Sequence, residues 1–104
     1  MTDVVKNNLE SIYDVCRNMQ VKSLYLFGSG ARQNEYNSDS DLDFLFQYNK
    51  DLEGLPLPPF DYFDLLFALE NITGKKVDLV AEEKIRNKFF LERVNKEKIR
   101  IYES

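Results

Sequence analysis

Apolar residues recur at intervals of three or four positions near the start of the chain. This period is typical of a helix with one buried face, and it predicts an amphipathic helix over residues 3–19 with Thr2 as its N-cap. The apolar stripe has five members: Val5, Leu9, Ile12, Cys16 and Met19. Because Cys16 lies in this stripe, we expect it to be a small core residue rather than a reactive thiol.

Shorter apolar runs farther along the chain predict strands. Residues 23–27 and 42–48 form the first two, and residues 75–80 form a third with an aspartate at its centre. Between the first two strands, the small residues of segment 28–32 allow a short helix, and residues 33–40 are expected to be a polar loop.

Two more helices are predicted in the second half of the chain, over residues 60–71 and 82–96. The segment 55–59 holds all three prolines and should be irregular, because proline has no amide hydrogen to donate. Residues 99–102 are expected to form a short edge strand or an ordered tail. Three apolar side chains of the last helix should point inward: Ile85, Phe89 and Val94.

This order of elements implies an α/β fold in which helices pack against one mixed β-sheet. At 104 residues the chain is expected to be a single small domain, residues 1–104. The net charge of −4 argues against a broad basic surface, so no direct nucleic-acid binding is expected. A cytoplasmic protein without membrane contact is expected, since the chain shows no leader pattern and no apolar run of roughly 18 residues.

Several kinds of catalytic chemistry are excluded by composition. The chain has no histidine and a single cysteine. Disulfides, zinc sites built from thiolates or imidazoles, and Ser-His-Asp triads are therefore not available.

Paired acids supply the first candidate site. Asp41 and Asp43 should project to the same face of the second strand, because side chains alternate along a strand. The apolar residues between and after them should face the core: Leu42, Phe44 and Phe46. Two converging carboxylates can hold Mg²⁺, which completes its shell with water and substrate phosphates.

The Gly28-Ser29-Gly30 turn favours an anion pocket over two other nucleotide-binding motifs. A dinucleotide fingerprint would need a third glycine where Gln33 stands, and a Walker loop would need Ser or Thr after Gly74-Lys75. Glycines instead allow backbone amides to approach phosphate oxygens, and Ser29 adds a hydroxyl donor.

A calcium site is a further alternative for the acids. Residues 39–43 resemble the opening of an EF-hand loop, which has acids at positions one, three and five. Phe44 stands where that loop requires glycine, and Lys50 where it requires glutamate. Calcium binding by an EF-hand is therefore rejected.

A third acid, Asp78, lies within the predicted strand Val77-Asp78-Leu79-Val80, where an unpaired carboxylate would be costly to bury. Together with Gly28-Ser29 and Asp41-Leu42-Asp43, which are separated by eleven residues, this constellation resembles the minimal nucleotidyltransferases of the polymerase-beta superfamily. Gly-Ser-x-Ala-Arg, present here as residues 28–32, extends the resemblance.

The resemblance implies a polymerase-beta-like fold and a role for each motif residue. Asp41, Asp43 and Asp78 would bind two Mg²⁺ ions, with Asp78 also helping to remove the acceptor's proton. Gly28 and Ser29 would hold the phosphates of ATP, and Arg32 would either contact phosphate or pair with a loop acid.

Short chains of this kind resemble the antitoxin of HEPN/MNT toxin–antitoxin pairs. That resemblance implies AMP transfer from ATP to a tyrosine hydroxyl of a HEPN-type toxin. A binding-only antitoxin is the first alternative, with aromatic side chains as interface anchors: Tyr36, Tyr48, Phe60, Tyr62 and Phe63. Transfer to a small-molecule acceptor is the second alternative.

Overall fold

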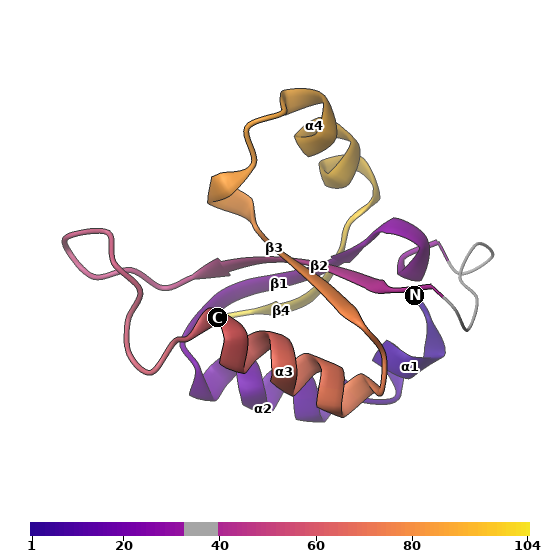
Figure 1. Ribbon diagram of the computed structural model, residues 1–104, viewed down its shortest axis with the longest axis horizontal. Helices are drawn as coiled ribbons and strands as arrows, with labels where there is room; N and C mark the ends of the chain where they lie inside the picture. Colours follow the sequence, from indigo (N-terminus) through magenta and orange to yellow (C-terminus); the bar gives the residue numbers. More distant parts are fainter. Residues whose placement is uncertain (33–39) are drawn as a thin grey trace.

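The computed structural model describes residues 1–32 and 40–104, whose strands form a four-stranded mixed sheet (Figure 1). The strand order is β3-β2-β1-β4. β1 is antiparallel to β2 and β4, whereas β2 and β3 are parallel. The strand bounds are Val21–Phe27 for β1, Leu42–Tyr48 for β2, Val77–Ala81 for β3 and Ile99–Glu103 for β4. The predicted α/β class is confirmed, and the C-terminal segment is an edge strand rather than a tail.

The larger core lies on one face of the sheet, against α2 (Leu9–Asn18) and α3 (Tyr62–Thr73), which lie below the sheet in Figure 1. Leu42, Phe44 and Phe46 point into this core, as the strand alternation predicted. Cys16 is fully buried among them and is a core residue, as expected.

A smaller core lies on the opposite face of the sheet, under α4 (Lys88–Glu97). Its fully or nearly buried members are Phe27, Leu45 and Val94. The Phe90 ring of α4 meets the Phe27 ring edge-on, with centroids 6.0 Å apart. Since Asp43 and Leu45 are two residues apart on β2, this is the face toward which Asp43 projects.

The prediction of one continuous N-terminal helix over residues 3–19 is wrong. The structure has α1 at Asp3–Lys6 and α2 from Leu9, with a break at Asn7 and Asn8. The Asn8 side-chain amide donates to the Val4 carbonyl at 2.7 Å, and asparagine in this position competes with the helical backbone hydrogen bonds. Thr2 is the N-cap by position, but its backbone amide donates to Gly30 and the described residues show no capping bond from its side chain.

The final helix predicted over residues 82–96 is also divided. Glu82–Lys84 form a short 3-10 helix, η2, and α4 begins only after Asn87, whose side chain accepts from the amides of Phe89 and Phe90. Ile85 and Val94 pack inward as predicted. The inward placement of Phe89 is wrong: it is 75% exposed, because Phe90 and Val94 define the buried face of α4.

The middle helix, α3, was predicted about two residues too early. Asp61 is its N-cap and accepts from the Asp64 amide, and Gly74, with φ of 68°, ends it in the left-handed conformation. No helix in the described part of the chain is both long enough and apolar enough to cross a membrane.

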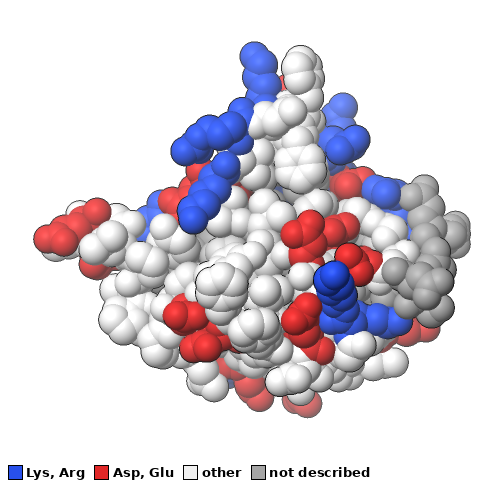
Figure 2. All heavy atoms as spheres, viewed as in Figure 1, with Lys and Arg blue, Asp and Glu red and all other residues white. Residues whose placement is uncertain are grey.

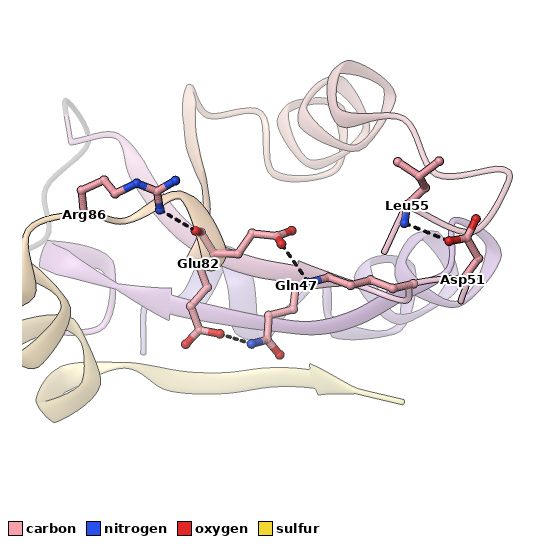
Figure 3. Close-up of polar contacts among 7 residues, drawn as sticks. Gln47, Asp51, Leu55, Glu82 and Arg86 are labelled. Atoms are coloured by element: carbon pink, nitrogen blue, oxygen red, sulfur yellow. Dashed lines mark hydrogen bonds and ion pairs between the residues drawn. The ribbon is translucent and has the colours of Figure 1, made fainter. Parts of the chain in front are cut away.

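Polar side chains hold the segments around the C-terminal end of β2 in place (Figure 3). The Gln47 amide donates to the Glu82 carboxylate, which ties η2 to the sheet. The Asp51 carboxylate accepts from the Leu55 amide at 2.9 Å and closes the turn that follows β2. Asp41 and Asp43 lie at the opposite end of β2.

We expect Asn87→Ala to destabilise the protein by about 1 kcal/mol, because two amides of the first turn of α4 lose their acceptor. Urea unfolding measures the change. The exposed Asn95→Ala in the last turn of α4 is the control and should shift the free energy of unfolding by less than about 0.5 kcal/mol. Equal effects of the two substitutions would contradict a capping role for Asn87.

Candidate active site

Gly28, at the end of β1, lies directly against the carboxylate of Asp43. Its φ is +70°, and a Cβ built on it would stand 2.3 Å from Asp43 Oδ2. Both the backbone conformation and the close approach require glycine here. Phe27, the residue before it, pairs with Asp43 across β1 and β2, so strand register sets the approach.

The second neighbour of Asp43 is Asp78. The two residues pair across the parallel strands β2 and β3, so both carboxylates belong to the same face of the sheet. Two of the three predicted acids are therefore brought together by sheet register, although they are 35 positions apart in the sequence. Asp78 reaches solvent, as expected for an acid in an otherwise apolar strand.

The remaining predicted residues lie around this pair. Asp41 is exposed and precedes β2 by one residue, so it is not itself part of the paired strand. Ser29 is half-buried in η1 (Gly28–Gly30), next to the glycine that contacts Asp43. Arg32 follows this turn and is paired with the carboxylate of Glu97, which is the last residue of α4 and not the loop acid predicted as its partner. The rest of the predicted loop, residues 33–39, lies outside the described residues.

A cavity of about 370 Å³ opens where these elements meet. Four of the predicted site residues line it: Gly28, Arg32, Asp43 and Asp78. α4 supplies three further lining residues, which the sequence did not single out: Phe90, Arg93 and Glu97. Figure 2 shows Lys and Arg side chains gathered around the part of the molecule that α4 occupies in Figure 1.

Glu97 makes the most direct contacts with the predicted site. Its Oε1 accepts from the Gly28 amide at 3.2 Å, and its Oε2 pairs with the Arg32 guanidinium. The Glu97 side chain is 20% exposed and that of Arg32 is 43% exposed, so the ion pair lies at the cavity and remains partly open to solvent. Phe90, Val94 and Glu97 stand four and three residues apart on one face of α4, so the helix period places Glu97 on the inward face but does not identify Gly28 as its neighbour.

Burial and neighbouring acids make Asp43 a weak acid. Its pKa is raised from the ordinary 3.8 to about 6; burial is the largest cause, the charges of Asp78, Asp41 and Glu97 add to it, and the charge of Arg32 opposes it. The ionised carboxylate is therefore poorly compensated in the protein alone. A bound cation would relieve this repulsion.

The acids fit a magnesium site whose ligands come only partly from protein. Among the residues that the structure describes, no group of three or more acidic side chains is arranged to hold a metal ion. Mg²⁺ commonly binds one or two carboxylates and takes its other ligands from water and substrate phosphates. The paired Asp43 and Asp78, beside a cavity, match this need.

A family model described as "Polymerase beta, Nucleotidyltransferase" matches residues 10–104. A provisionally named protein adenylyltransferase of Methanocaldococcus jannaschii is 38% identical over 71 residues. The match covers 67% of this chain and 66% of the relative, slightly less than two thirds of that protein's length.

Two solved structures have the same fold. A provisionally named minimal nucleotidyltransferase has a TM-score of 0.71 and 28% identity, and the match covers 94% of this chain and 95% of that one. An MNT antitoxin, solved in complex with the tri-AMPylated HEPN toxin of Shewanella oneidensis, has a TM-score of 0.62 and 17% identity. That match covers 95% of this chain and 72% of the other, and at this identity it shows the fold alone.

Gly28→Ala should destabilise the protein more than Gly54→Ala, as measured by urea unfolding. Both glycines have positive φ, so each substitution costs about 1 kcal/mol for backbone strain. Only at Gly28 does the new Cβ meet another residue, since nothing lies within 4 Å of the corresponding position at Gly54. Equal losses of stability would contradict the close packing of Gly28 on Asp43.

Asp43→Asn should stabilise the metal-free protein at pH 7 by about 1 kcal/mol, after discounting for the solvent screening of a half-buried group. The native pKa, about 6, lies above the ordinary 3.8, so wild-type stability falls as pH rises between these values. The gain should therefore vanish below about pH 4.

Urea unfolding in the presence of a chelator, from pH 3.5 to 8, measures this effect. Asp14→Asn, which removes an exposed acid on α2, is the control and should change stability little across the range. A variant of Asp43 that is less stable than wild type at pH 7 would contradict the electrostatic repulsion inferred here.

Proposed function

Because the chain belongs to the polymerase beta nucleotidyltransferase family, we propose that it transfers AMP from ATP to a tyrosine hydroxyl of a HEPN-type protein partner. The reaction, its dependence on Mg²⁺ and the identity of the acceptor are all parts of this proposal. The observation that carries it is the packing of the Gly28 turn on Asp43, with Asp78 alongside.

This arrangement supports a phosphate subsite next to a carboxylate pair. Gly28 and Ser29 lie in a turn whose backbone approaches Asp43, and Arg32 lies at the same cavity. In the proposal, Gly28, Ser29 and Arg32 hold the β- and γ-phosphates of ATP. Arg93 lines the same cavity from α4 and adds positive charge beside the nucleotide.

Asp41, Asp43 and Asp78 are the proposed magnesium ligands. The raised pKa of Asp43 supports a cation here, because burial and then the neighbouring acids disfavour its ionised form. When bound, Mg²⁺ supplies charge stabilisation to the phosphate oxygens, and two ions would do so for both the attacking and the leaving oxygen. The protein's own part is to hold the ligands, orient the triphosphate and receive a proton.

The proposed reaction is an in-line displacement at the α-phosphorus. The tyrosine oxygen of the partner forms a bond to the α-phosphorus, and the bond from that phosphorus to the bridging oxygen breaks. Pyrophosphate leaves with the bonding electron pair, and the phenolic proton passes to Asp78. With no histidine and a buried Cys16, direct transfer without a covalent enzyme intermediate is favoured.

The choice of acceptor rests on what related proteins are named for. The M. jannaschii relative carries the name of a protein adenylyltransferase, which favours a protein acceptor. The S. oneidensis complex pairs an MNT antitoxin with an AMPylated HEPN toxin, which favours a toxin of that class. The choice of tyrosine as the modified residue comes from the sequence resemblance, and it is the most specific part of the proposal.

Intact-mass spectrometry of this chain mixed with its HEPN-type partner, ATP and Mg²⁺ tests the function. Wild type should raise the partner's mass by whole AMP units. Asp43→Asn and Asp78→Asn should each slow the transfer by roughly 10³-fold, because each removes a charge from the metal and proton-transfer site.

Asp14→Asn on α2 is the matched control and should transfer AMP at the wild-type rate. Tandem mass spectrometry locates the modified side chain, and AMP on a residue other than tyrosine would overturn the choice of acceptor group. An unmodified partner whose toxicity is still neutralised by the Asp41→Asn/Asp43→Asn double variant would establish the binding-only alternative.

A further inference from the structure

Glu97 occupies the groups that the proposed function assigns to phosphate. One carboxylate oxygen accepts from the Gly28 amide at 3.2 Å, and the other is paired with Arg32. An amide of a glycine turn and a guanidinium are the kinds of donor that bind phosphate oxygens. Glu97 therefore makes, within the chain, the contacts that a terminal phosphate of ATP would make.

The position of Glu97 is unfavourable by local rules. It is the last residue of α4, where the negative end of the helix dipole disfavours a carboxylate. It also adds to the acidic surroundings that raise the pKa of Asp43. Such departures from local preference are expected mainly at functional sites, where another requirement outweighs them.

We propose that Glu97 acts as an internal phosphate mimic that holds the Gly28–Arg32 subsite in the nucleotide-free protein and is displaced by the β- and γ-phosphates of ATP. This inference rests on the proposed function, since it assumes that the triphosphate binds at that turn. Glu97 then sets nucleotide affinity by competition: the free energy of its own contacts is subtracted from that of the incoming phosphates.

The competition has two consequences for the site. Without nucleotide, the Gly28 amide and Arg32 each have the Glu97 carboxylate as a partner. Ligands that carry β- and γ-phosphates must break these contacts, whereas AMP, which lacks those phosphates, does not need to. Glu97 therefore affects the binding of ligands that carry β- and γ-phosphates and not the binding of AMP.

Isothermal titration calorimetry with AMP-PNP and Mg²⁺ tests the proposal. Glu97→Gln keeps the shape of the side chain but removes its charge, and it should tighten AMP-PNP binding by about two- to fivefold, the range for a partly exposed ion pair. The affinity for AMP should stay unchanged. Glu92→Gln, which removes an exposed acid elsewhere on α4, controls for net charge and should leave both affinities at the wild-type value.

Glu97→Asp provides a second variant that keeps the charge. Its shorter side chain withdraws the carboxylate from the Gly28 amide, so AMP-PNP binding should tighten in the same direction. Thermal unfolding checks that each variant is folded. If wild type binds AMP-PNP and neither Glu97 variant binds it more tightly, the inference is overturned while the proposed function stands.

Weaker AMP-PNP binding by Glu97→Gln would also overturn the inference, because it would mean that Glu97 supports the subsite by positioning Arg32. Equal tightening for AMP would show a general charge effect rather than competition with the terminal phosphates. If no form of the protein binds AMP-PNP, the proposed function fails together with the inference.

Discussion

The close approach of the Gly28 backbone to the Asp43 carboxylate is the constraint on which the site depends. Any side chain at position 28 would overlap the carboxylate, and the positive φ of Gly28 is what turns the chain away from β1. The turn and the acid come together because β1 and β2 are antiparallel neighbours with Phe27 opposite Asp43. The sheet register therefore places the Gly28 backbone and the Asp43 carboxylate side by side.

The two faces of the sheet differ in how fully they are packed. The face under α2 and α3 holds the larger core, with fully buried members such as Phe44 and Leu65, and anchors the strands. The opposite face has only a small core around Val94, so α4 covers it near the acids without filling the space above Asp43 and Asp78. A lightly packed helix leaves room for a ligand where a full core would not.

The acidic charges at the site lower the stability of the protein alone and favour the binding of a cation. Asp43 is half-buried near other acids, and both the burial and the neighbouring charges raise its pKa. A cation would compensate the charge of the acids, and an anion would compensate the donors of Gly28 and Arg32. Glu97 meets the second need from within the chain.

The sequence alone predicted most of the elements and identified the motif residues, because both are local. Alternation along β2 put Leu42, Phe44 and Phe46 in the core, and the glycine turn and acids were visible from their residue types and spacing. It failed where a side chain competes with the backbone, as at Asn8 and Asn87, which divided two predicted helices. The parallel pairing of β2 and β3, which sets Asp78 beside Asp43, and the return of α4 over the sheet, which brings Glu97 to Gly28, were decided by tertiary structure. These contacts join residues 35 and 69 positions apart, and no local pattern encodes such a distance because it depends on how the whole sheet is ordered.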